Sequence, residues 1–204
     1  MNNLSDADLI HRFRSGQTQA FNLLAWRWQK PILNFLYRYL GNVQDAEDAS
    51  QRTFMKVYQK LHDLKDSSKF QVWLYQVAAN QARDQLRHRK RNAFFSIGSN
   101  SNPHSDQEPE AFAEIADPEG NNLESQVHQT QLHGIFEEAM RTIPEDQRLI
   151  IVMKIYQDLK FVEIAEVLKL PLNTVKSRMY YGIKALRSIL NKQNFSEEVL
   201  NYEM

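Results

Sequence analysis

Residues 161–190 have the sequence FVEIAEVLKLPLNTVKSRMYYGIKALRSIL, and this stretch decides the fold of the C-terminal half. Apolar residues recur every three or four positions on both sides of the central Leu-Pro-Leu, which is the spacing of two amphipathic helices around a tight turn. We expect one helix over 161–168 and a second over 174–190, with Asn173 as its N-cap. Ala165 is small enough to let the two helices cross closely, so the pattern predicts a helix-turn-helix.

The outer face of the second helix begins with short hydrogen-bonding groups mixed with cations. Between residues 163 and 192 there are six basic and two acidic residues, a net charge of +4 that suits a phosphate backbone. The first residues of a recognition helix contact base edges in the major groove. A surface helix of a larger bundle would show the same periodicity, and periodicity alone leaves that alternative open. The residues that we expect to contact DNA are Asn173, Thr174, Lys176, Ser177, Arg178 and Tyr181.

The N-terminal half has the same helical periodicity, and no window alternates polar and apolar residues for long enough to indicate a sheet. Ser5 and Asp8 have the spacing of a capping box, and a long amphipathic segment follows over 18–40. Gly41 breaks the pattern, and two further amphipathic segments follow with a polar break over 63–69 between them. We therefore predict an all-α protein that consists of two helical bundles.

The last of these N-terminal segments places aromatic residues ahead of a run of cations. Rings on which unpaired bases can stack, beside cations that follow the phosphates, are typical of surfaces that bind single strands. The alternative is that the rings belong to the core and the cations to a solvated helix end. The residues concerned are Phe70, Trp73, Gln76, Asn80, Arg83 and Arg87.

The preceding segment begins with acids, which favour the positive end of a helix dipole. Ordinary capping explains these acids, and a docking face for a partner explains them equally well. The candidate docking residues are Asp45, Glu47, Asp48, Gln51, Phe54 and Lys56.

Acidic and basic residues are unevenly distributed along the chain, although its formal net charge is zero. Residues 1–91 contain fifteen Lys and Arg against eight Asp and Glu, a net charge of +7, whereas residues 92–125 contain seven acids and neither Lys nor Arg. Such a segment, rich in Ser, Asn and Pro, cannot bury enough apolar surface to offset its ordering entropy. We expect 92–125 to be a flexible acidic linker between domains over 1–91 and 126–192, with a tail over 193–204 to which we assign no role.

No catalytic, cofactor or metal site is expected. The six histidines lack the spacing of metal ligands, the chain has no cysteine, and no Gly-rich loop is present to cradle a phosphate. No apolar run approaches the ~20 residues that cross a bilayer, and the first residues do not resemble a signal peptide. We therefore expect neither an enzyme nor a membrane-inserted or secreted protein.

Three segments taken together are similar to parts of the bacterial sigma factors. Residues 45–58, DAEDASQRTFMKVY, resemble their core-polymerase-binding helix, and residues 73–80, WLYQVAAN, resemble their promoter-melting and −10-recognising helix. Residues 143–148, IPEDQR, followed by TVKSR at 174–178, resemble their −35-recognising domain. The small size, with two domains around a linker, is similar to the extracytoplasmic-function (ECF) group.

This resemblance implies a mechanism. The N-terminal domain would dock on core RNA polymerase and capture unpaired −10 bases, with Lys65 and Ser68 joining Phe70 and Asn80 as candidates for the base pocket. The C-terminal domain would hold the −35 duplex in its major groove, and polymerase would perform the catalysis. The resemblance also implies an anti-sigma partner and a cytoplasmic location in a bacterium.

Three positions depart from the usual pattern of the family. Lys169 stands where a turn glycine is frequent, which predicts a different backbone path, and Tyr181 stands where arginine is frequent. Gly182 replaces an alanine and should destabilise the helix by roughly 1 kcal/mol.

Two rival classes of protein remain. A stand-alone helix-turn-helix repressor would explain 145–192 but not the N-terminal segments, and a helical adaptor would not explain the basic recognition face.

Overall fold

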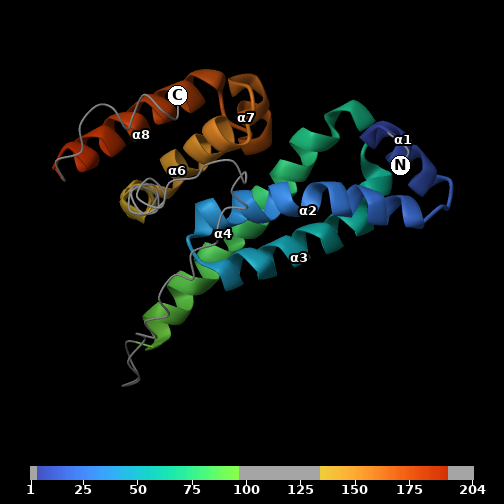
Figure 1. The fold of residues 1–204 in the computed structure, drawn as a ribbon, viewed down its shortest axis with the longest axis horizontal. Coiled ribbons are helices and arrows are strands. Elements are labelled where there is room, and N and C mark those ends of the chain that lie inside the picture. The colour runs from blue at the N-terminus through green and yellow to red at the C-terminus, as the bar shows by residue number, and fades with distance from the viewer. Residues whose placement is uncertain (1–3, 97–133, 193–204) are drawn as a thin grey trace, which may run out of the picture.

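The computed structural model describes residues 4–96 and 134–192, and these residues contain helices and turns but no β-strand. The prediction of an all-α protein is confirmed (Figure 1). Residues 134–142 are helical and precede α6. The elements are α1 (Asp6–Arg14), α2 (Gln19–Leu40), α3 (Val43–Lys60), η1 (Leu61–Asp63), η2 (Ser67–Lys69), α4 (Phe70–Ser96), α6 (Glu145–Ile151), η3 (Val152–Tyr156), α7 (Phe161–Leu168) and α8 (Leu172–Lys192).

Local signals set the helix boundaries of the N-terminal domain. The Ser5 hydroxyl accepts from the Asp8 backbone N–H, and the Asp8 carboxylate accepts from the Ser5 backbone N–H, so the expected capping box is present. Gly41 ends α2 with φ 71°, in the left-handed region that suits glycine. The side chain of Asn42 then caps α3 by accepting from the Asp45 backbone N–H at 2.9 Å.

Helix α4 extends to Ser96, five residues beyond the boundary that we expected at residue 91. Residues 92–96 are Asn-Ala-Phe-Phe-Ser, which contain neither Gly nor Pro to stop the helix. The rest of the expected acidic linker, the first residues of the expected domain over 126–192, and the tail after residue 192 lie outside the described residues.

The helix-turn-helix forms with the first helix at the predicted residues and the second slightly longer than expected. Helix α7 spans Phe161–Leu168, and α8 begins at Leu172. Asn173 is therefore inside α8, and the expectation that it caps this helix is wrong. The backbone carbonyl of Pro171 accepts from the N–H groups of Thr174 and Val175 at 2.9 and 3.2 Å, so the helix begins two residues earlier than expected.

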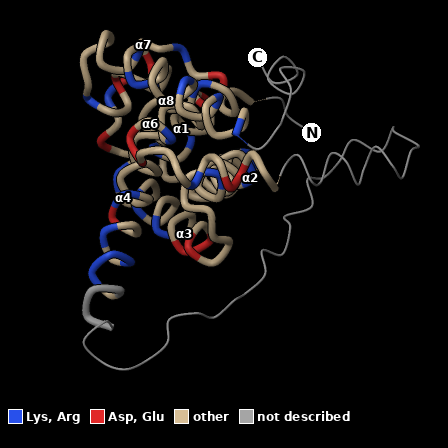
Figure 2. Tube along the Cα trace, turned by 90° about the vertical axis from the view of Figure 1, so that its left-hand side faces the viewer, with Lys and Arg blue, Asp and Glu red and all other residues tan. Residues whose placement is uncertain are grey.

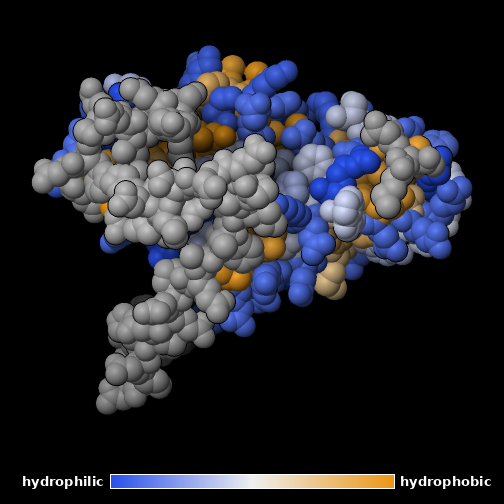
Figure 3. All heavy atoms as spheres, viewed as in Figure 1, coloured by the Kyte–Doolittle hydropathy of each residue, from blue (hydrophilic) through white to orange (hydrophobic). Residues whose placement is uncertain are grey.

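The two halves of the described chain pack against each other. Figure 1 shows α6, α7 and α8 together above α2, with α3 below it and α1 beside its right-hand end. The buried apolar residues of both halves form one hydrophobic cluster. The coloured part of the face in Figure 3 is mainly hydrophilic, with hydrophobic patches between the hydrophilic residues. The two-bundle architecture is thus present, with the bundles in direct contact.

Candidate nucleic-acid interfaces and docking surface

The turn between α7 and α8 is closed by a residue in the left-handed region. Lys169 has φ 54° and is the C-cap of α7, and the Leu170 backbone N–H donates to the Ala165 carbonyl at 3.0 Å. This is the conformation that glycine usually takes at a helix C-terminus. The different backbone path that we expected from Lys169 is therefore not found. The lysine adopts the turn at a steric cost of about 1–2 kcal/mol.

The outward face of α8 presents most of the residues that we expected to contact DNA. Asn173, Lys176, Ser177 and Tyr181 are exposed, and Thr174 is half-buried. This face is polar and positively charged over the first turns of the helix, and no neighbouring element covers its exposed side chains within the described residues.

Tyr180 belongs to the same face although we did not include it among the expected contacts. Its side chain is 64% exposed, and its ring lies 5.6 Å from the ring of Tyr181. Asn173, Ser177 and Tyr180 follow the i, i+4, i+7 spacing that aligns side chains on one helix face. That spacing was the signal in the sequence that could have identified it.

Arg178 differs from its neighbours because it is turned toward α6. Its Nη1 lies 3.0 Å from Oδ2 of Asp146, in the first turn of α6, and its side chain is 33% exposed. One turn further along α8, Gly182 is buried against α6. A Cβ atom at Gly182 would lie 2.8 Å from Cδ1 of Ile151 and 3.2 Å from Cβ of Gln147. The glycine therefore permits a close approach of α8 to α6.

The segment before α4 contains the expected −10 candidates Lys65 and Ser68, and both are exposed. The Asp66 carboxylate accepts from the backbone N–H of Ser68 at 2.9 Å and from its hydroxyl at 2.6 Å. These hydrogen bonds lower the pKa of Asp66. The loop is thus ordered by its own side chains and holds Ser68 at the surface.

The expected −10 residues on α4 differ in how exposed they are. Asn80 and Arg87 are exposed, while Trp73, Gln76 and Arg83 are half-buried. Figure 2 shows Lys and Arg residues gathered along the exposed C-terminal part of α4. These five residues are spaced by three or four positions and lie along one face of the helix.

Phe70 is a core residue in this arrangement. Its side chain is 2% exposed, and its ring packs against Trp28 at 6.1 Å and Trp73 at 6.2 Å between centroids. A base cannot contact this ring without a rearrangement, so the expectation that Phe70 lines a base pocket does not fit the structure. The apolar spacing of the residues around Phe70 is what a core position requires.

Helix α3 exposes Glu47, Asp48, Gln51 and Lys56 of the expected docking residues, and Phe54 is half-buried. Asp45, the remaining acid of this set, is turned toward α4. Its carboxylate accepts from Gln85 Nε2 at 2.5 Å and pairs with Arg89 at 3.5 Å.

Met55 is the most exposed apolar residue of α3 and was missed by the sequence analysis. Its side chain is 63% exposed, and it lies four residues after Gln51 and seven after Asp48 on the same face. Phe54 and Lys56 flank this face on opposite sides. A methionine at the spacing of a polar helix face is the sequence pattern that could have identified it.

Polar contacts join the two halves of the molecule. They connect residues far apart in the sequence, and each involves one residue of the N-terminal domain and one of the C-terminal domain. The contacts include Lys69 Nζ to Glu166 Oε1 at 2.6 Å, Tyr75 hydroxyl to Gln157 Oε1 at 2.5 Å, Lys90 Nζ to Glu145 Oε1 at 2.8 Å, and Arg141 Nη2 to the Gly41 carbonyl at 3.1 Å. Burial also raises the pKa of Tyr75, so its hydroxyl remains a hydrogen-bond donor.

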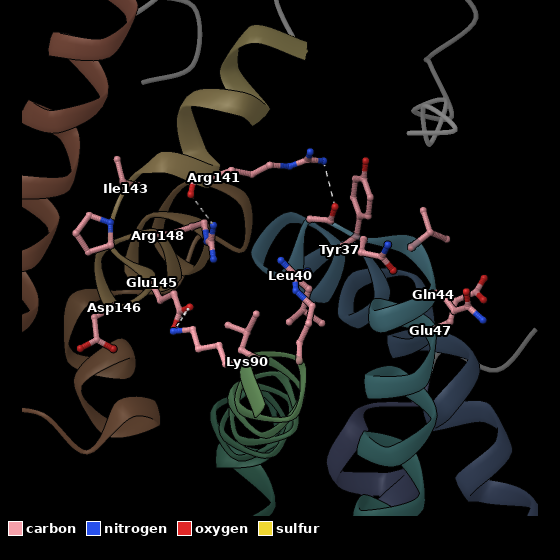
Figure 4. Close-up of a pocket in the computed structure, with 16 residues that line it drawn as sticks. Tyr37, Leu40, Gln44, Glu47, Lys90, Arg141, Ile143, Glu145, Asp146 and Arg148 are labelled. Carbon is pink, nitrogen blue, oxygen red and sulfur yellow. Dashed lines mark hydrogen bonds and ion pairs between the residues drawn. The ribbon is translucent and has the colours of Figure 1, made fainter. Parts of the chain in front are cut away.

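A cleft of about 1330 Å³ opens between the ends of α2 and α4 and the start of α6 (Figure 4). Arg148, which is 7% exposed, lies at its wall and faces the ring of Tyr39 at 5.4 Å. Its Nη1 donates to the carbonyls of Met140 and Arg141 at 3.4 Å. Burial raises the pKa of Tyr39 to about 12, so the pair combines a neutral ring with a cation. Arg148 therefore stabilises the interface between the halves.

Within the described ranges, no group of three or more His, Cys, Asp or Glu side chains is arranged to hold a metal ion. None of the helices described is long and apolar enough to cross a membrane.

Comparisons with known proteins agree with the two-part architecture. Sigma-70 region 2 matches residues 24–92, and sigma-70 region 4 matches residues 133–186. The RNA polymerase sigma-H factor of Pseudomonas aeruginosa is 30% identical over 91% of this chain and 93% of its own length. The ECF RNA polymerase sigma-E factor of Salmonella typhimurium is 30% identical over 90% of this chain and 93% of its own length. The chain belongs to the ECF sigma factors.

The fold of this sigma factor is also found in solved structures. A structure of CnrH in complex with the cytosolic domain of CnrY matches 92% of this chain and 97% of that chain, with 20% identity and a TM-score of 0.62. The sigma factor RpoE in complex with the anti-sigma factor NepR from Bartonella quintana matches 84% of this chain and 96% of that chain, also with 20% identity and a TM-score of 0.62. The protein is a factor for promoter-specific transcription initiation, as the three sequence segments predicted.

Proposed function

We propose that this sigma factor docks on core RNA polymerase through α3, captures the −10 element with the loop before α4 and with α4 itself, and binds the −35 duplex with α8. The observation that supports the −35 assignment is the exposed polar and basic face at the start of α8. An N-terminal recognition face of this chemistry suits base edges and phosphates in a major groove. The chain itself performs no catalysis, and it acts in the cytoplasm, where bacterial polymerase transcribes.

For the −10 element we retain Lys65, Ser68, Asn80, Arg83 and Arg87, with Trp73 and Gln76 at the edge of the surface. We do not retain Phe70, because its ring is buried. Cations along α4 would follow the phosphates of the displaced strand, and the polar groups near its start would contact an unpaired base.

For the docking surface we propose Glu47, Asp48, Gln51 and Lys56, with Phe54 at its margin and Met55 at its centre. Asp45 would act by holding Arg89 and Gln85 of α4 in place. An anti-sigma factor is a further proposed partner, because solved structures with this fold include the complexes of CnrH with CnrY and of RpoE with NepR.

The test is transcription in vitro from genomic fragments, with purified core polymerase in the presence and absence of the protein. The expected result is a small set of start sites that require both components and share one upstream and one downstream sequence element. Lys176→Ala should lower initiation at these sites by about tenfold, the loss expected for one good base contact of ~1–3 kcal/mol.

The same fragments distinguish the rival classes. A stand-alone repressor would bind its fragment specifically without polymerase and would lower transcription by another sigma factor. A helical adaptor would show no salt-dependent affinity for DNA in either condition. Start sites that do not depend on the protein would overturn the proposal.

A further inference from the structure

The two adjacent acids at the start of α6 point in opposite directions. Glu145 pairs with Lys90 of α4 at 2.8 Å, whereas Asp146 pairs with Arg178 of α8 at 3.0 Å. Figure 4 shows Glu145 turned toward Lys90, whereas the carboxylate of Asp146, which also lines the cleft, points to another side. The contact of Asp146 lies entirely within the C-terminal domain. Its role is therefore separate from the packing of the two halves.

The close approach of α8 to α6 brings the side chains of Asp146 and Arg178 within contact distance. Gly182 lies against Ile151 and Gln147 so tightly that even a methyl group would meet them below ordinary contact distance. Arg178 stands one helical turn before Gly182, and Asp146 directly precedes Gln147. The glycine thus fixes the spacing of the two helices at the level where the ion pair forms.

The ion pair orders a side chain that would otherwise be flexible. Both partners are substantially exposed, with 33% of the Arg178 and 53% of the Asp146 side chain accessible, so the pair contributes little to the stability of the fold. Arginine has several N–H donors in a rigid fork. With one nitrogen on the carboxylate, the remaining donors are held at a defined position beside the face formed by Ser177 and Tyr181.

We propose that Asp146 is a positioning residue for promoter recognition, which holds the guanidinium of Arg178 in place for one base pair of the −35 element. This inference rests on the proposed function of α8. Asp146 does not itself contact DNA, since its negative charge would repel the phosphates. It sets how sharply Arg178 distinguishes one base from the others, rather than how strongly the domain binds.

The experiment uses holoenzyme assembled from core polymerase and the full chain. Duplexes with a random segment in place of the −35 element are selected by the wild-type protein and by Arg178→Ala, Asp146→Asn and the double variant. Arg178→Ala should abolish the preference at one base-pair position. Asp146→Asn should weaken the preference at that same position by about two- to tenfold, which is the range for disordering one flexible side chain.

The double variant tests whether the two residues act together. Asp146→Asn should add nothing to the loss of preference in the Arg178→Ala background, because its effect passes through the arginine. Asp158→Asn is the matched control. It removes one carboxylate from the same domain, where Asp158 pairs with Lys154 at 3.6 Å, and asparagine tolerates its φ of 48°. This control should leave every base preference unchanged.

Two outcomes would overturn the inference in different ways. If Arg178→Ala removes a preference and Asp146→Asn changes only the affinity for all duplexes alike, then Asp146 does not position the arginine and the proposed function stands. If Arg178→Ala changes no preference, both the inference and the assignment of Arg178 to the −35 contact are wrong. Thermal midpoints near that of the wild type for both single variants would exclude unfolding as the cause.

Discussion

At the scale of single residues, Gly182 is a tightly packed position of α8. Gly182→Val should destabilise the C-terminal domain by about 1–3 kcal/mol, because its side chain would overlap Ile151 and Gln147 in a packed interior. Urea denaturation measures the change. Lys184→Val, two positions along at an exposed site of the same helix, is the control and should change the stability by less than about 1 kcal/mol. Equal losses in both variants would show that β-branching in α8, and not packing, is responsible.

The sequence predicted the helix around Gly182 but assigned the wrong role to the glycine. From the pattern alone it is a weak point in a helix, since glycine has a low helix propensity. Its contact with α6 involves residues more than thirty positions earlier in the chain, and no local pattern reveals such a neighbour. The same limit applies to Arg178, whose residue type predicted a DNA contact but not its pairing with Asp146.

At the scale of one element, α3 offers a docking face whose apolar centre is Met55. Met55→Ala should weaken binding to core polymerase by about tenfold, if the methionine is an interface anchor worth ~1–2 kcal/mol. Fluorescence titration of labelled protein with core enzyme measures the dissociation constant. The helix should remain folded, because this side chain is mostly exposed.

Lys60→Ala, at the end of α3, is the control for the loss of an exposed long side chain. Its dissociation constant should equal that of the wild type. If Met55→Ala binds as tightly as this control while Asp48→Arg does not bind, the face is held by charge alone. The methionine would then be a solvent-exposed residue without a role in docking.

Helix types and most boundaries were predictable because local signals determine them. The capping box at Ser5, the glycine at Gly41 and the short helix α7 followed directly from residue type and spacing. The start of α8 was misplaced because Asn173 is a good capping residue by type, whereas the backbone carbonyl of Pro171 accepts the first hydrogen bonds of the helix. The end of α4 was misplaced because we placed it where the charge composition changes. A change in charge locates the end of a helix less precisely than a Gly or Pro residue does.

At the scale of the whole molecule, the contact between the halves depends partly on exposed ion pairs. Glu166→Lys would place two cations together at Lys69, and the closed arrangement should become less populated, by a small amount because both side chains are exposed. Adding Lys69→Glu should restore the attraction. Energy transfer between labels on cysteines introduced at Lys60 and Lys184 measures the separation, since the chain has no other cysteine.

Salt supplies the control for this measurement. The effect of Glu166→Lys should shrink as ionic strength rises, because exposed charges are screened beyond a Debye length of about 8–10 Å near physiological salt. A constant change in energy transfer at all salt concentrations would mean that the substitution acts by steric disruption. The sequence could not predict this packing, because its contacts join residues such as Tyr75 and Gln157 across both domains.

The adjacent acids of α6 have a consequence for protein engineering. A chimera that joins residues 134–192 to the N-terminal domain of another sigma factor would transfer Asp146 and Arg178 together, so its promoter preference should travel with the graft. Glu145 and Glu166 would arrive without Lys90 and Lys69, unless the recipient supplies lysines at matching places. A graft of this domain should therefore keep its promoter preference but lose part of its packing against the recipient's N-terminal domain. The first property involves Asp146 and the second involves Glu145, two residues joined by one peptide bond.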